Sequence, residues 1–245
     1  MQVSSDTILK VNDLTKSVQL EDKSLSLLQP TDLTVNAGET LAIVGSSGSG
    51  KTTLLSILAG LDLPSSGEVY LKTHPLHQLN EEQRSQVRAQ HVGFIFQQFL
   101  LVNSLTALEN VMLPAELANI EHAVERGQKL LEQVGLGDRM DHYPGQLSGG
   151  EQQRVAIARA FITEPDILFA DEPTGNLDTK TGLTITDLLF ELNKKTGTTL
   201  VLVTHDPKLA ARCQRQVEMD SGVLTDAQSD SDFVEPSTEN VANMG

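Results

Sequence analysis

The sequence predicts an α/β fold in which a mainly parallel β-sheet is covered by helices on both faces. Short, continuous apolar runs, typical of strands that are buried on both sides, alternate with helical patterns along the chain. A long helical stretch, from about residue 106 to residue 161, interrupts this alternation. We therefore expect one α/β core with an α-helical subdomain inserted into it.

The elements expected in the first half of the chain follow from apolar patterning and from turn residues. Loose alternation indicates a first strand at 8–14, and a second is expected at 31–35. The tight turn at 36–39 leads into an apolar strand at 41–44. The remaining elements of this half are a turn at 21–24, a helix at 53–59, a loop at 64–67, a strand at 68–71, a helix from Asn80 to about residue 90 and a strand at 91–96.

The second half is expected to contain more helix. The two patterns at 106–118 and 121–134 end before Gly135 and Gly137, which are helix stop signals. Further helices are expected at 150–161 and 179–195, with buried strands at 166–170 and 198–203. We assign residues 1–97 and 162–225 to the core, about 98–161 to the helical subdomain, and 226–245 to an acidic tail that we expect to be disordered.

The composition limits the classes of partner. The chain has 245 residues, with 18 basic and 33 acidic side chains, a net charge of −15 and a pI near 4.7. Such a surface repels a phosphate backbone, so no nucleic-acid partner is expected. One cysteine excludes an internal disulfide, and no apolar run approaches the roughly 18 residues of a membrane-spanning helix. The first residues also lack the pattern of a signal peptide, so we expect a cytoplasmic protein that reaches a membrane only through a partner.

Residues 45–52 have the sequence Gly-Ser-Ser-Gly-Ser-Gly-Lys-Thr, which is the GxxxxGK[ST] pattern between a predicted strand and a predicted helix. The glycines let successive amides point at an anion, and the helix N-terminus adds its positive dipole. Lys51 is expected to reach the β- and γ-phosphates, and the Thr52 hydroxyl to bind Mg²⁺. The expected residues for a nucleoside triphosphate are Gly45, Ser46, Ser47, Gly48, Ser49, Gly50, Lys51, Thr52 and Thr53.

Two further stretches contain residues suited to catalysis or ligand binding. Asp171 and Glu172 follow the buried strand at 166–170, at the sheet edge where α/β proteins bind ligands. We expect Asp171 to hold Mg²⁺ and Glu172 to accept a proton from an attacking water. Ser148, Gly149 and Gly150 form a second Gly-rich turn that opens a helix, and this turn is either an anion site or an ordinary capped helix. If it is an anion site, the economical arrangement is a head-to-tail dimer in which it faces the γ-phosphate held by another copy of the chain.

The order of these motifs resembles that of the ATP-binding cassette (ABC) ATPases, to about residue 225. The stretch 147–154, Leu-Ser-Gly-Gly-Glu-Gln-Gln-Arg, is similar to the family signature. The stretch 171–178 resembles the lipoprotein-release, macrolide-export and cell-division branch (LolD, MacB and FtsE), and 75–79 and 209–213 are similar to the YbbA group of that branch. This resemblance implies a P-loop cassette with a mainly parallel core, an antiparallel β edge and the inserted helices.

The resemblance also implies roles that the residues alone do not. Gln97, otherwise a polar strand end, would contact Mg²⁺ or water and move with a membrane partner. His205, otherwise a structural histidine, would contact the γ-phosphate, and residues 176–178 would cross the dimer interface. Val18 stands where the family usually stacks an aromatic ring on adenine, so we expect weak discrimination between ATP and GTP.

The arginines of two predicted helices are expected to have no role in the chemistry. Arg154 and Arg159, near acidic neighbours in the helix at 150–161, are expected to be structural. The helix at 80–90 is expected to present a solvated face rather than a basic patch, because acids in its first turn offset Arg84 and Arg88.

The function expected from this resemblance is an ATP-hydrolysing subunit that forms a homodimer around two MgATP. It would work under a separate integral membrane permease of the FtsX or MacB type, at the inner face of the cell membrane. The permease would dock near residues 97–101. The competing interpretation is a regulatory ATP switch or scaffold that transports nothing, as in the FtsE-like members.

Overall fold

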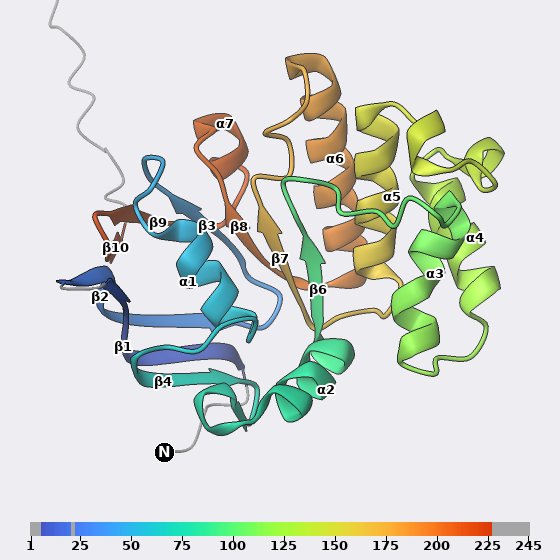
Figure 1. The fold of residues 1–245 in the computed structure, drawn as a ribbon. Coiled ribbons are helices and arrows are strands. Elements are labelled where there is room, and N and C mark those ends of the chain that lie inside the picture. Colours follow the sequence, from blue (N-terminus) through green and yellow to red (C-terminus); the bar gives the residue numbers. More distant parts are fainter. Residues whose placement is uncertain (1–5, 21–22, 227–245) are drawn as a thin grey trace, which may run out of the picture.

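Two β-sheets with a helix between them form one side of the molecule, and the longer helices form the other (Figure 1). The structure is a computed structural model that describes residues 6–20 and 23–226. The larger sheet has the strand order β10-β9-β3-β8-β7-β6. Its strands are β3 (Thr40–Val44), β6 (Val92–Ile95), β7 (Ile167–Asp171), β8 (Thr199–Val203), β9 (Arg215–Asp220) and β10 (Val223–Asp226). All neighbours are parallel except β9 and β10, which form an antiparallel hairpin at the edge.

The smaller sheet is antiparallel and has the order β2-β1-β4-β5. It consists of β1 (Thr7–Leu20), β2 (Lys23–Asn36), β4 (Ser66–Leu71) and β5 (His74–Pro75). Helix α1 (Lys51–Leu58) lies between this sheet and the larger one (Figure 1).

Alternate residues of the parallel strands enter two separate cores, because successive side chains of a strand point to opposite faces. In β7, Ile167 and Phe169 join α1 and the antiparallel sheet, whereas Leu168 and Ala170 join the helices on the other face. Strand β8 divides in the same way. Since both faces are buried, these strands are continuously apolar, as the sequence predicts.

The second core is covered by α5 (Gly149–Phe161) and α6 (Thr179–Thr196), and α3 (Ala107–Leu117) and α4 (Ala123–Gln133) pack against α5. Asn80 and Thr106 cap α2 (Glu81–His91) and α3 with reciprocal capping boxes, which fixes where both helices begin. The short elements are α7 (Pro207–Ala210) and three 3₁₀ turns, Leu76–Gln78, Gly137–Arg139 and Pro144–Gln146.

The predicted α/β class and the long elements are confirmed, with two kinds of difference. Strands β1 and β2 extend well beyond the predicted 8–14 and 31–35. Strands β5, β9 and β10 and helix α7 were not predicted, and Asp226, assigned to the tail, is the last residue of β10. The rest of the predicted tail and residues 21–22 of the predicted turn lie outside the described residues.

Candidate functional site

Most of the residues predicted to bind the triphosphate and Mg²⁺ lie at the carboxyl edge of the parallel strands. Strand β3 leads into the phosphate loop, β7 ends at Asp171, and β6 and β8 end shortly before Gln97 and His205. A cleft of about 580 Å³ at this edge is lined by Gln97, Asp171, Glu172 and the segment from Ser47 to Thr53. Parallel strands of one sheet end at a common edge, so the topology brings together residues that lie far apart in the chain.

The phosphate loop has the backbone that its glycines permit. Gly50, the N-cap of α1, has φ 109°, and Gly45 has φ 150°. A Cβ on Gly45 would lie 2.1 Å from the Met219 carbonyl oxygen, so no larger residue fits there. Lys51 is buried, and its ammonium donates to the carbonyls of Gly45 (2.9 Å) and Ser46 (2.7 Å). The first amides of α1 have no partner within the helix, so the loop presents donors to an anion.

Two segments that contact the phosphate loop or line its cleft were not predicted. The β9–β10 turn consists of Ser221 and Gly222, both with positive φ (49° and 81°). The Gly222 amide donates to the Ser49 carbonyl (2.9 Å), and its own carbonyl accepts from the Gln29 amide (2.8 Å). Both turn residues line the cleft, as do three residues at the start of β2, Leu25, Ser26 and Leu27. A Ser-Gly pair between alternating apolar residues is a hairpin signal, so this turn could have been predicted from the sequence.

The oxygen donors expected for Mg²⁺ lie side by side. The Thr52 hydroxyl donates to Asp171 Oδ2 at 3.0 Å, across 119 positions of the chain. A hydroxyl and a carboxylate are hard ligands of the kind that Mg²⁺ prefers. No group of three or more His, Cys, Asp or Glu side chains among the described residues could hold a metal by itself. This suits Mg²⁺, which is usually held by one or two carboxylates together with phosphates and waters. The residues present therefore fit the ion.

Burial raises the pKa of Asp171 above the ordinary aspartate value of 3.8, and the negative charge of Glu172 adds to the rise. A raised pKa means that protonation begins at a higher pH than in a free aspartate, and only the ionised form binds Mg²⁺ well. We expect the Mg²⁺-dependent part of ATP affinity to fall as the pH drops from neutral towards 3.8, by up to about tenfold per pH unit once Asp171 is protonated. Titrating a fluorescent ATP analogue with and without Mg²⁺ across this pH range measures the fall in affinity.

Asp171→Asn is the control for this experiment. The amide does not titrate, so binding by this variant should keep only the pH dependence that comes from the nucleotide itself. Superimposable profiles for the natural chain and for Asp171→Asn would contradict the prediction.

Glu172 is held in an unusual backbone conformation beside the predicted histidine. Its φ is 43°, and its amide donates to the Val203 carbonyl at 2.9 Å. His205 Nδ1 lies 3.0 Å from Glu172 Oε1, and the histidine side chain is largely exposed. A non-glycine residue with positive φ costs free energy, and such residues often occur at functional sites. The fold thus places this carboxylate at the cleft and pairs it with an imidazole.

Ser148, Gly149 and Gly150 line a different cleft, of about 560 Å³, with residues 176–178 and Thr181. The two clefts share no lining residue. Ser148 caps α5 in a reciprocal capping box, in which its Oγ accepts from the Glu151 amide at 3.3 Å and its own amide donates to Glu151 Oε2 at 2.8 Å. The Ser148 Oγ also donates to Glu151 Oε2 at 2.7 Å. The hydrogen bonds that the carboxylate accepts from Ser148 favour its ionised form and lower the pKa of Glu151. Within one chain, the second Gly-rich turn does not contact the phosphate-loop cleft.

The surroundings of Val18 bear on base recognition. Val18 pairs with Leu25 in the β1–β2 ladder, and both side chains are exposed. Leu25 lines the cleft, whereas Val18 does not. The apolar surface available to a base therefore includes Leu25, which was not predicted. Neither residue offers an aromatic ring, so weak discrimination between ATP and GTP stays a prediction.

Two of the arginine predictions need correction. Arg84 was expected on a solvated face, but it is buried and donates to the Leu79 carbonyl at 2.7 Å as well as to Glu81. Arg159 was expected near acidic neighbours, but its guanidinium donates to the carbonyls of Leu100 and Phe99. Arg154 lines the same cleft as Glu151, and its Nε is buried without a hydrogen-bond partner among the described residues. That Arg154 is structural stays a prediction.

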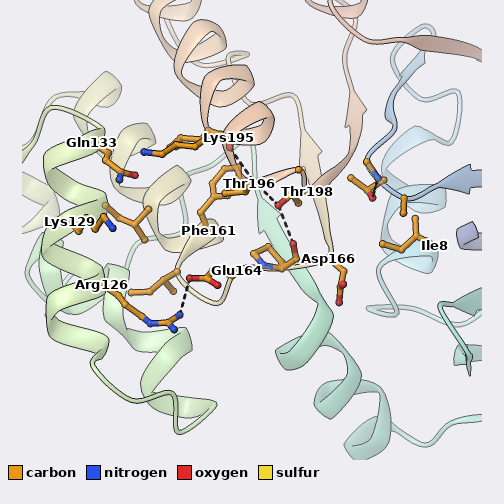
Figure 2. Close-up of a pocket in the computed structure, with 18 residues that line it drawn as sticks. Ile8, Arg126, Lys129, Gln133, Phe161, Glu164, Asp166, Lys195, Thr196 and Thr198 are labelled. Carbon is orange, nitrogen blue, oxygen red and sulfur yellow. Dashed lines mark hydrogen bonds and ion pairs between the residues drawn. The ribbon is translucent and has the colours of Figure 1, made fainter. Parts of the chain in front are cut away.

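A hollow of about 540 Å³ lies at the opposite edge of the sheet (Figure 2). It is bordered by Asp166 and Thr198, which precede β7 and β8, and by side chains of α4. Two charged side chains of this hollow form an ion pair with each other, since Arg126 Nη1 lies 3.3 Å from Glu164 Oε1. A dashed line marks this pair in Figure 2. No residue of the phosphate loop lines this hollow, so it is not the nucleotide site.

Comparison with known proteins places this site in context. Residues 28–175 match the model of the family described as "ABC transporter". The chain is 58% identical over 222 residues to the uncharacterized ABC transporter ATP-binding protein YbbA of Escherichia coli K12, covering 90% of this chain and 97% of that protein. It is 50% identical to the lipoprotein-releasing system ATP-binding protein LolD of Shewanella oneidensis, covering 89% and 96%.

Solved structures agree. A dimeric, post-hydrolysis structure of the cassette MJ0796 bound to ADP and Pi matches with a TM-score of 0.81 and 38% identity, over 89% of this chain and 98% of that one. A second dimeric structure of MJ0796 matches with a TM-score of 0.80 and 40% identity, over 87% and 95%. The fold and the resemblance to the LolD and YbbA branch are confirmed. None of the helices in the described part of the chain is long and apolar enough to span a membrane.

Proposed function

The chain belongs to the ABC transporter family, whose cassettes hydrolyse ATP, and on that premise we propose that it is the ATPase subunit that drives a separate membrane permease. One observation carries the proposal. A single cleft holds the phosphate loop, the Thr52–Asp171 pair and the Glu172 carboxylate, which are the parts that phosphoryl transfer to water requires.

The roles follow from the chemistry of each group. Lys51 and the loop amides bind and neutralise the phosphates. Thr52, Asp171 and Gln97 hold Mg²⁺, which when bound neutralises charge on the transferred phosphoryl group. Glu172 accepts a proton from the attacking water, and His205, 3.0 Å from it, orients that carboxylate and contacts the γ-phosphate.

In a dimer, the second Gly-rich turn of one subunit can contact the nucleotide of the other. It cannot serve the phosphate loop of its own chain, because the two clefts share no lining residue. We place Ser148, Gly149 and Gly150 of one subunit over the nucleotide held by the other, in a head-to-tail homodimer. The dimeric MJ0796 structures, to which this chain is similar over most of its length, support that arrangement.

The permease is proposed to be of the FtsX or MacB type, with the subunit in the cytoplasm at the inner face of the membrane. The relatives support this, since LolD is the ATP-binding protein of a lipoprotein-releasing system. Leu100, Val102 and Leu117 are exposed apolar side chains, and we propose them as docking contacts for the permease. They lie in the segment of about 98–161 that we propose as the helical subdomain.

Purification with the membrane fraction tests this function. A tagged chain should copurify with a membrane protein, and that protein should raise the ATPase rate several-fold. Val102→Glu combined with Leu117→Glu should abolish copurification while leaving the ATPase of the isolated subunit unchanged. A subunit that copurifies with no membrane protein, or whose ATPase is indifferent to it, would favour the regulatory switch.

A further inference from the structure

Arg159 is a partly buried arginine whose hydrogen bonds go to the main chain instead of to an acid. Its Nη1 donates to the Leu100 carbonyl at 2.6 Å and its Nη2 to the Phe99 carbonyl at 2.9 Å. No carboxylate among the described residues forms an ion pair with it, and burial lowers the pKa of its guanidinium. Removing a cation from water without a counterion costs free energy, and the two charge-assisted hydrogen bonds offset part of that cost.

The two carbonyls that Arg159 binds belong to a strained segment. Leu100 has φ 48°, an unfavourable conformation for a residue with a side chain, and that side chain is 54% exposed. Packing of Leu100 therefore does not hold the segment in place. The planar guanidinium, with two donors for two successive carbonyls, is well suited to do so, whereas an ammonium is not.

The same segment contacts residues that line both clefts. Its first residue, Gln97, lines the phosphate-loop cleft, and the Gln97 carbonyl accepts from Asn176 Nδ2 at 2.8 Å. Asn176 lines the other cleft, together with Ser148 and Gly149. The ring of Phe99 lies close to that turn, because a Cβ added to Gly149 would be 3.7 Å from Phe99 Cζ. Residues 97–100 thus bridge the nucleotide cleft and the Gly-rich turn of the same chain.

We infer that Arg159 is a positioning residue that fastens residues 97–100 to helix α5, so that the state of a chain's own nucleotide cleft sets the position of the Gly-rich turn at the start of α5. A change at Gln97 moves the Phe99 and Leu100 carbonyls, and their two hydrogen bonds carry that movement to α5. In the dimer this turn covers the partner's nucleotide, so Arg159 makes the two nucleotide sites interdependent. The inference rests on the proposed dimeric function.

The experiment uses the full chain with Glu172→Gln, in which nucleotide is retained. Arg159→Met and Arg159→Lys are each added to that background, and Arg126→Met is the matched control. Arg126 is an arginine of the same helical segment whose partner is the exposed Glu164. Three quantities are measured: the Kd of a fluorescent ATP analogue, the concentration dependence of ATP-driven dimerisation by sedimentation, and hydrogen exchange of the amides at 97–102.

With Arg159→Met we expect the Kd for ATP to stay within about twofold, since the phosphate loop is untouched, while ATP-driven dimerisation weakens by about tenfold or more. Hydrogen exchange at 97–102 should accelerate. Arg159→Lys keeps the charge and can donate to one carbonyl, so its effects should have the same direction and a smaller size. If Arg159→Met does not yield folded protein, the same three quantities are compared for Arg159→Lys alone. Arg126→Met should change none of the three quantities.

Two results would overturn the inference. The first is dimerisation of both Arg159 variants at the same concentrations as Glu172→Gln alone. The second is a parallel loss of melting temperature, ATP affinity and dimerisation, which would reduce Arg159 to a structural residue. Failure of Glu172→Gln itself to dimerise with ATP would instead contradict the proposed function.

Discussion

Glu172→Gln is expected to bind MgATP with nearly unchanged affinity, to form a long-lived dimer, and to lose turnover by about 100- to 10,000-fold. Glutamine has almost the same shape as glutamate but cannot accept a proton, and general-base catalysis contributes a rate factor of this order. Glu172 lines the nucleotide cleft and its carboxylate lies 3.0 Å from His205, so the substitution removes the base at the place where water would attack. Phosphate release under steady-state conditions and sedimentation with ATP measure the two effects.

Asp206→Asn is the matched control for that variant. Asp206 is the exposed acid next to His205 and caps α7 through its side chain, which asparagine also does well. Turnover of this variant should stay within about twofold of the natural chain, as expected for a surface change. Rapid hydrolysis by Glu172→Gln, at the rate of the Asp206→Asn control, would remove Glu172 from its proposed role.

Ser148→Arg should abolish ATP-driven dimerisation and reduce turnover by at least about 100-fold, while the monomer still binds ATP. The long cationic side chain would occupy the space into which the partner's nucleotide must fit. Because the phosphate-loop cleft contains no residue of this turn, binding to a single chain should not change. Sedimentation with ATP in the Glu172→Gln background, together with nucleotide binding at low protein concentration, separates the two effects.

Two further variants distinguish the capping role of Ser148 from its proposed contact with the partner's nucleotide. Ser148 also caps α5, and loss of an N-cap costs about 1 kcal/mol of stability. Ser148→Ala loses the cap without adding bulk, whereas Ser148→Asn keeps a cap. If Ser148→Arg dimerised as well as Ser148→Asn, the turn would be the ordinary capped helix that the sequence alone allows.

Elements whose signals are local could be predicted well from the sequence. The phosphate loop, the capped helices and the buried strands each depend on residues within a few positions of one another, and the structure has them where the patterns place them. The antiparallel sheet was predicted too short, because β1 and β2 contain polar residues at their exposed ends and are stabilised by pairing with each other. The β9–β10 hairpin was missed although its Ser-Gly turn is a recognisable signal.

Long-range contacts account for what could not be predicted. Leu25 reaches the cleft only because β2 passes beside the phosphate loop, and no local pattern marks it. The hydrogen bonds from Arg159 to Phe99 and Leu100 span 60 and 59 positions, so without the fold this arginine has no identifiable partner. The Thr52–Asp171 pair could be predicted despite its separation, because strand ends of a parallel sheet converge.

The hairpin turn behind the phosphate loop has a consequence for how tightly nucleotide binds. Since the Gly222 amide already fastens the loop at Ser49, and Gln29 fastens Gly222, the loop is ordered before any phosphate arrives. The conformational entropy of ordering it is lost during folding and does not weaken association. Affinity for ATP thus depends on a rigid framework that is completed only when the last hairpin of the described chain has folded against the first strands.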